Sequence, residues 1–61
     1  MDQVFVATNK EFGISAVVTK RADGWYSIVL RDDDSGNHLP NVRIREDLSD
    51  ARLMACAMAN V

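Results

Sequence analysis

The side chains best suited to bind a metal ion lie in the acidic segment 32–37, which reads DDDSGN. Oxygen ligands at alternate positions suit Ca²⁺, but a calcium loop between two helices also needs glycine at its sixth position and glutamate at its twelfth. Counted from Asp32, those two positions hold Asn37 and Arg43. The sequence therefore predicts a solvated hairpin loop here and no metal site.

A catalytic site is the second interpretation of this region. His38 follows the acidic loop and could serve as a base beside one of its aspartates, but it is the only histidine and has no Ser or Cys nucleophile next to it in the sequence. Catalysis requires a pocket that orients a nucleophile, a base and a donor, for which 61 residues leave little volume. Cys56, the only cysteine, lies among Ala and Met residues, where a thiol packs as a small inert side chain. We expect neither an enzyme nor a cofactor.

A third group of side chains could bind nucleic acid. An aromatic ring gives a base a surface to stack on, and neighbouring arginines can contact phosphates. Strand alternation predicts such a group on the outer face of a sheet, and the same face could instead be solvated or contact a second sheet. The formal net charge of −2 gives no overall attraction to nucleic acid, although a local basic patch can still act. The candidate nucleic-acid or partner face consists of Arg21, Trp25, Arg31, Arg43 and Arg45.

Four strands are expected to position these side chains, at residues 4–7, 14–20, 25–31 and 39–45. Turn-forming residues separate them, most clearly Asp23-Gly24 and the acidic loop. Pro40 lacks an amide donor and marks the start of the last strand or an edge of the sheet. In that strand the alternation predicts Val42 and Ile44 facing inward, with the two arginines facing outward.

One helix is expected to follow these strands. Asp47 is the preferred N-cap, with Ser49 as its competitor, and Asp50 suits the first turn of the helix dipole. At 100° per residue, one broad face of this helix should cover the sheet. That face consists of Leu48, Ala51, Met54, Ala55, Met58 and Ala59. The alanines at spacing four could lie against the chain's own sheet or against a helix of a second copy.

The far side of the helix is also apolar, because residues 53–61 contain a single polar side chain, Asn60. A domain of this size buries only about 60% of the surface that its unfolded chain exposes. Such small domains usually add disulfides, a metal or a partner. One cysteine and one histidine allow neither an internal disulfide nor a structural zinc site, so association with a partner is the remaining way to stabilise the fold. We therefore predict a homodimer with contacts at Leu53, Ala57 and Val61, through helices or through strand edges.

The expected core combines the inward residues of the strands with the inner face of the helix. It consists of Ile14, Ala16, Val18, Tyr26, Ile28, Leu30, Val42, Ile44, Leu48, Met54, Ala55 and Met58.

Two families resemble this chain in the order of its elements. Residues 16–26 (AVVTKRADGWY) with residues 47–51 (DLSDA) resemble HicB-type antitoxin domains, but the acidic loop stands where that family carries a Pro-Asp-Leu-Pro-Gly-Cys-like segment. A ββββα order is also similar to single-strand-binding transcriptional coactivator domains that dimerise through strands and helices, whose lysine-rich strands are not matched. The diagnostic residues of neither family are present, so no family is assigned and no site is carried over.

The sequence thus predicts one α+β domain over residues 1–61, a four-stranded antiparallel meander with one C-terminal helix packed on one face. No apolar run approaches the ~20 residues that cross a bilayer, and no signal peptide begins the chain, so we expect a cytoplasmic protein without membrane contact. The leading functional hypothesis is a non-catalytic homodimeric regulatory module that binds another, unidentified protein. Single-stranded nucleic-acid binding by the outer face is the alternative.

Overall fold

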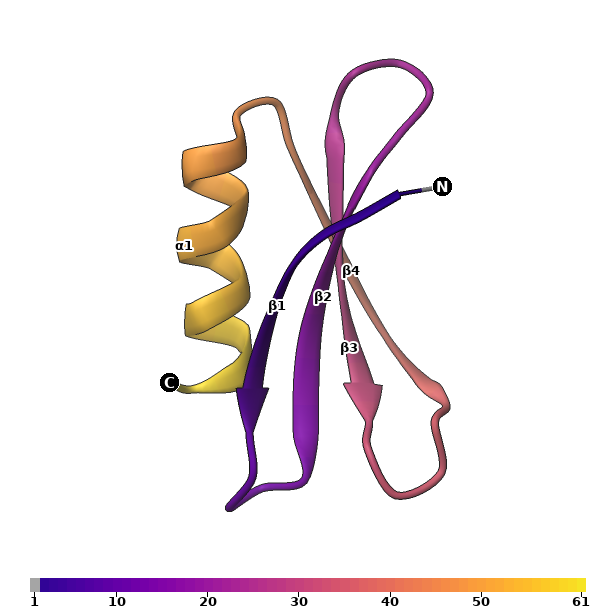
Figure 1. Ribbon diagram of the computed structural model, residues 1–61, viewed down its shortest axis with the longest axis vertical. Helices are drawn as coiled ribbons and strands as arrows, with labels where there is room; N and C mark the ends of the chain where they lie inside the picture. The colour runs from indigo at the N-terminus through magenta and orange to yellow at the C-terminus, as the bar shows by residue number, and fades with distance from the viewer. Residues whose placement is uncertain (1) are drawn as a thin grey trace.

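The computed structural model describes residues 2–61. Its elements follow in the order β1 (Asp2–Asn9), β2 (Ile14–Lys20), β3 (Tyr26–Asp32), β4 (His38–Arg45) and α1 (Leu48–Ala59). The strands form one antiparallel sheet in the order β1-β2-β3-β4, and α1 packs on one face of it (Figure 1). The predicted ββββα architecture is confirmed.

The turns are formed by local hydrogen bonds of the expected residue types. After β1, the side-chain oxygen of Asn9 accepts the amide of Phe12 at 3.1 Å, and Gly13 takes a φ of 68°. After β2, Asp23 accepts the amide of Trp25 at 3.0 Å, and Gly24 takes a φ of 87°. Glycine adopts such positive φ values without steric cost, which explains both turn signals. Trp25 belongs to this second turn, so β3 begins one residue later than predicted.

The core lies between α1 and the central strands. Residues 48–59 are rich in Ala, Leu and Met, which favour a helix, and the alanine stripe turns towards the sheet. Ala51, Ala55 and Ala59 are each 0% exposed, so the stripe packs on the chain's own sheet, one of the two interpretations left open by the sequence. Short side chains let the helix lie close to the strands. The buried cluster consists of Ala7, Ala16, Val18, Ile28, Ala51, Ala55 and Ala59, with Leu48, Met54 and Met58 half-buried against it.

Both ends of α1 have defined caps. Asp47 is the N-cap, as predicted, but its side chain makes no capping hydrogen bond. At the other end Asn60 adopts the left-handed conformation, which Asn tolerates better than most residues. The side-chain amide of Asn9 donates to the carbonyl groups of Ala59 at 2.9 Å and Asn60 at 3.2 Å. These two bonds fasten the end of the helix to the end of β1.

The predicted orientation of β4 is wrong. The register pairs Ile28 with Arg43 and Val29 with Val42, and directly opposite residues share a face of the sheet. Ile28 is a core residue under α1, so Arg43 lies on the helix side and Val42 on the helix-free side. The same alternation places Arg45 opposite Tyr26 and Ile44 opposite Ser27. Val42 is 49% exposed and is not a core residue.

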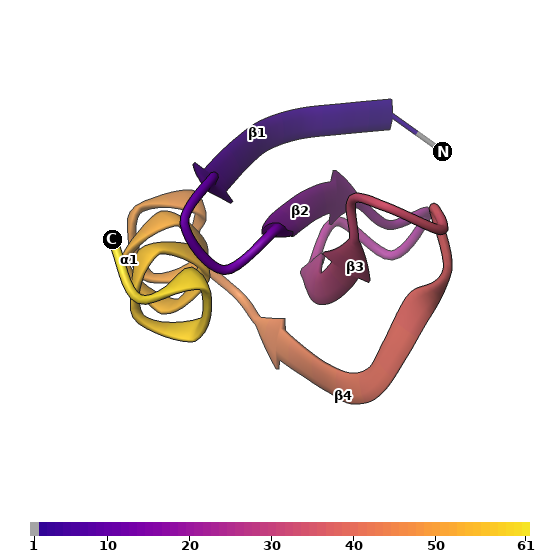
Figure 2. The ribbon, with the colours of Figure 1, turned by 90° about the horizontal axis from the view of Figure 1, so that it is seen from below.

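The physical reason for this reversal is the position of β4 at the edge of the sheet. The helix packs mainly on β1, β2 and β3, so little core lies under β4, and the alternating sequence fits either face. The β3–β4 register also shifts between Val29 and Arg31, which inserts extra residues around Pro40. Figure 2 shows β4 bending away from the other strands. Arginine stems can extend past the rim of a helix and keep their charged ends in water, which allows the observed orientation.

Candidate binding surfaces

The helix-free face of the sheet is built from three rows of cross-strand neighbours. The middle row crosses all four strands and is entirely valine: Val6, Val17, Val29 and Val42. One flanking row contains Gln3, Thr19, Ser27 and Ile44. The other flanking row contains Thr8, Ser15, Arg31 and His38. We call the middle four residues the valine row.

The valine row is unusual for a face that no helix covers. Where one face of an antiparallel sheet is solvated, polar side chains normally occupy that face. Here Val17 is only 9% exposed although it lies opposite to the helix, because its neighbours Val6 and Val29 flank it closely. Val42, at the β4 end of the row, is 49% exposed. Val6 and Val29 are half-buried, so the apolar surface of this row that another molecule could cover is largest at Val42.

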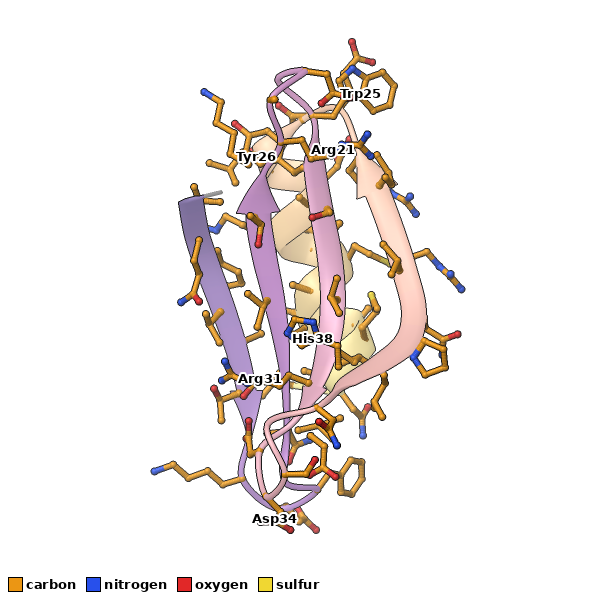
Figure 3. All side chains as sticks on the ribbon, turned by 90° about the vertical axis from the view of Figure 1, so that its right-hand side faces the viewer. Arg21, Trp25, Tyr26, Arg31, Asp34 and His38 are labelled. Carbon is orange, nitrogen blue, oxygen red and sulfur yellow. The ribbon has the colours of Figure 1, made fainter. Side chains whose placement is uncertain are left out.

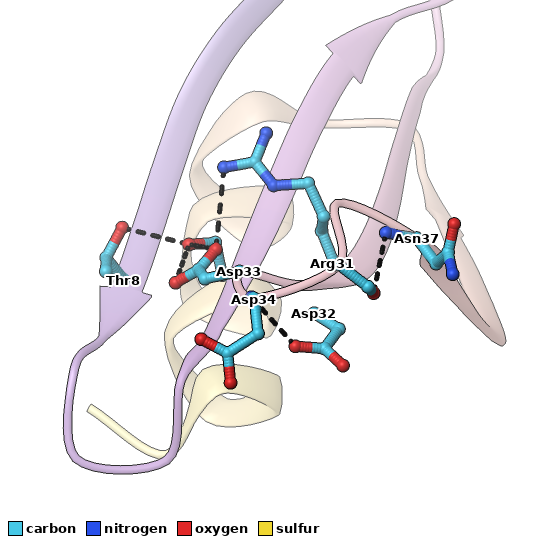
Figure 4. Close-up of polar contacts among 8 residues, drawn as sticks. Thr8, Arg31, Asp32, Asp33, Asp34 and Asn37 are labelled. Atoms are coloured by element: carbon cyan, nitrogen blue, oxygen red, sulfur yellow. Dashed lines mark hydrogen bonds and ion pairs between the residues drawn. The ribbon is translucent and has the colours of Figure 1, made fainter.

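A cluster of polar side chains closes one end of this face. Ser15 is 1% exposed, and its hydroxyl donates to the two carboxylate oxygens of Asp33 at 2.8 and 3.1 Å. The hydroxyl has one proton, so the 3.1 Å contact with Thr8 is a bond that Thr8 donates. The guanidinium of Arg31 lies 3.7 Å from the same carboxylate (Figure 4). The backbone amide of Asp33 also donates to the carbonyl of Gly13 at 2.9 Å, so the β3–β4 loop folds back onto the β1–β2 hairpin.

This polar cluster does not have the geometry of a catalytic site. Ser15 is too deeply buried to meet a substrate, and its hydroxyl is already held by a carboxylate. Within residues 2–61, His38 makes no side-chain hydrogen bond to Ser15 or Asp33. Over the same residues, no three His, Cys, Asp or Glu side chains form a group that could hold a metal ion. The cluster therefore positions the loop and neutralises Arg31. The sequence held no signal for it, because Ser15 and Asp33 meet only when the loop folds back.

The five residues of the candidate nucleic-acid face do not come together. Arg21 and Trp25 lie at one end of the sheet, and Arg31 lies towards the other (Figure 3). Arg21 forms an ion pair with Asp23 at 3.2 Å, and Trp25 is 42% exposed. The remaining two members, Arg43 and Arg45, belong to the opposite side of the sheet by register.

The residues predicted as dimer contacts lie on the free side of α1. Leu53 is 71% exposed, Val61 is 69% exposed, and Ala57 is also exposed. Beside them an open groove of about 330 Å³ runs between β1 and α1. Its lining residues are Phe5, Ser49, Arg52, Leu53 and Cys56. We call it the β1–α1 groove.

One charged side chain lines the β1–α1 groove. The guanidinium carbon of Arg52 lies 5.0 Å from the centre of the Phe5 ring, at the distance of a cation–π contact. The stem of Arg52 and the ring of Phe5 thus join the helix to the edge strand. Cys56 has a free thiol and is half-buried against the core cluster. Sequence periodicity identified the exposed position of Leu53, but it could not identify Phe5 as its neighbour.

No protein-family model, curated protein or solved structure matches this chain. In the part of the chain that the structure describes, the single helix is too short to cross a membrane.

Proposed function

We propose that this protein is a small non-catalytic module that forms a homodimer and binds another protein through the helix-free face of its sheet. The observation that carries this proposal is the valine row, an apolar stripe across all four strands of an uncovered face. Most side chains in the two flanking rows are neutral and polar, which suits the border of a protein contact with an apolar centre. A protein surface that brings its own apolar side chains is the partner that such a stripe fits.

The charges on this face favour a protein partner over nucleic acid. Affinity for nucleic acid depends mainly on basic side chains that neutralise phosphates. Arg31 is the one arginine that the register places in these rows, and it already faces the carboxylate of Asp33. Arg43 and Arg45 extend from the other side of the sheet. A single-stranded nucleic acid would therefore find neither a basic track nor an aromatic platform within one surface.

The proposed homodimer is supported by the exposed apolar side chains of α1. Leu53 and Val61 are the two most exposed large apolar residues of the described chain. Covering them with a second copy would remove apolar surface from water, which is favourable. A dimer would also present two helix-free faces and could bind a partner with repeated or symmetric sites more tightly than one face.

The proposal is tested by comparing the proteins captured by three immobilised forms of the chain. Val42→Lys places a charge in the exposed end of the valine row, and Ser35→Lys adds the same charge to the acidic loop as a matched control. Proteins bound by the unmodified chain should also bind Ser35→Lys, and their amounts should fall at least about tenfold on Val42→Lys. Circular dichroism of both variants checks that each is folded.

Three results would overturn the proposal. One is that no protein binds the unmodified chain above the bare resin. Another is that folded Val42→Lys captures the same proteins in the same amounts. The third is that short single-stranded oligonucleotides quench Trp25 fluorescence with a steep dependence on salt, which would assign the molecule to nucleic-acid binding.

A further inference from the structure

The two edges of the sheet differ in how well they are protected from pairing. Edge strands expose unpaired amide and carbonyl groups, and proteins commonly block them with prolines, charges or irregular backbone. β4 carries all three, with Pro40, the two arginines Arg43 and Arg45, and a shift of register. β1 has no proline and no charged side chain between Gln3 and Asn9. Between Gln3 and Asn9 the only such feature is a register shift between Gln3 and Phe5, which leaves residues 5–9 regular.

The open edge of β1 is continuous with the β1–α1 groove. Phe5 belongs to both, since it is part of the regular segment of β1 and lines the groove together with Leu53. One side of the molecule therefore presents unpaired backbone groups beside exposed apolar side chains. An extended strand supplied by a partner would pair with these backbone groups, and an apolar layer above that strand would cover the exposed apolar side chains.

We propose that β1 pairs with β1 of a second copy in antiparallel orientation, so that two sheets join into one of eight strands with both helices on the same face. This inference rests on the proposed function, because it specifies how the proposed homodimer forms. A two-fold axis at Val6 places Phe5 opposite the small side chain of Ala7. It also brings Val6 against its own copy, which extends the valine row without a break across both subunits. The uncharged segment meets no like charge across the axis.

The size of this side of the molecule matches what a stable dimer needs. The molecule measures 32 × 19 × 17 Å, so one long side makes up about a fifth of its surface. For a total accessible surface of 4023 Å², a fifth is about 800 Å², the area that each partner buries in a standard interface. The β1–α1 side is one of these long sides, because β1 and α1 run along the long axis (Figure 1). Pairing of β1 alone would bury less, so the helix side chains must take part.

The test uses single-cysteine variants in a Cys56→Ala background, followed by mild oxidation and separation under non-reducing conditions. Opposite β-carbons in paired antiparallel strands lie about 4.5–5.5 Å apart, near enough for a disulfide after a small adjustment. Val6→Cys should form a covalent dimer in high yield. Leu39→Cys on the β4 edge and Val42→Cys on the sheet face are matched controls and should stay largely uncrosslinked.

A second measurement keeps the proposal falsifiable if Val6→Cys does not fold or its sulfur atoms meet at a poor angle. Amide hydrogen exchange of the unmodified chain is compared at low and high micromolar concentration. The outward amides of residues 5–7, which the axis at Val6 pairs with one another, should become protected as concentration rises, while those of β4 should not change. Protection of β4 alone, or of neither strand while the mass is that of a dimer, would overturn the β1 pairing.

The outcomes separate this inference from the proposed function. A dimer that crosslinks through Val42→Cys joins by its sheet faces, and one that crosslinks through Leu39→Cys joins by β4. Either result overturns the pairing of β1 and leaves a homodimer. A folded chain that has the mass of one copy at every concentration overturns both the pairing and the homodimer in the proposed function.

Discussion

Replacing Leu53 by glutamate should separate the proposed dimer without unfolding the subunit. Leu53 is 71% exposed, so a charge at this position costs the isolated subunit little, within about 0.5 kcal/mol for a surface site. In the dimer the same side chain lies at the rim of the β1–α1 groove and is covered by the second copy. The glutamate would then have to give up water in an apolar contact, which is unfavourable.

The size of the effect follows from the exposed fraction. Burying a whole leucine side chain stabilises by about 1.5–3 kcal/mol, so covering the 71% that the subunit leaves open contributes about 1–2 kcal/mol. A two-fold axis counts this contribution twice, which gives about 2–4 kcal/mol per dimer. Since about 1.4 kcal/mol is a factor of ten, the dissociation constant should rise about 30-fold to several hundred-fold.

The assay is size-exclusion chromatography with light scattering over a concentration series, together with thermal unfolding followed by circular dichroism. Leu39→Glu makes the same substitution on β4, the edge of the sheet away from the β1–α1 groove, and serves as the control, which should leave the dissociation constant within about twofold. A folded Leu53→Glu variant that associates as tightly as the unmodified chain would contradict the placement of Leu53 in the dimer contact. Equal weakening of association by Leu39→Glu would contradict it too.

Three further predictions concern the contacts that hold the sheet and helix together. Asn9→Asp replaces a donor with a carboxylate beside the last carbonyl groups of α1, so it should lower stability by about 2 kcal/mol or more, measured by urea unfolding. The carbonyl groups should raise the pKa of this new carboxyl above its usual value near about 4, so the deficit should shrink as the pH falls through that raised pKa. It should be smallest below about pH 4, where the protonated carboxyl donates again, and a deficit independent of pH would contradict the assigned donor. Ser15→Ala removes the hydrogen bond to the carboxylate of Asp33, and water can replace part of that bond. The melting temperature should therefore fall by about 4–8 °C, and an unchanged value would show that Ser15 does not hold the loop. Ala55→Leu should cost about 1–3 kcal/mol or more because the site is 0% exposed, whereas Ala57→Leu on the exposed side should cost the dilute, monomeric subunit little. Equal melting temperatures of the two variants under these dilute conditions would contradict the helix orientation.

The sequence was sufficient for the architecture because each element carries an independent local signal. Hairpin turns at Gly13 and Gly24 need positive φ, and the helical period of the apolar residues after Asp47 predicts which side of the helix faces the sheet, although the alanines alone left a second copy open as their neighbour. Neither property depends on contacts far along the chain. The inner face of α1 and the exposure of Leu53 could therefore be predicted from periodicity alone.

The candidate site could not be predicted in the same way, because it depends on register. The alternation in residues 42–45 is compatible with two orientations, and only the pairing of Ile28 with Arg43 decides between them. Reversing that one strand moves two arginines off the helix-free face and completes the valine row. The loop that carries Asp33 gives a second example, since its return to Ser15 leaves no trace in local sequence.

Sedimentation of the unmodified chain across the micromolar range decides whether this protein is a homodimer. We predict a folded species of twice the 6.8 kDa subunit mass at the upper concentrations, with dissociation on dilution. A folded species of 6.8 kDa at every concentration would contradict the claim.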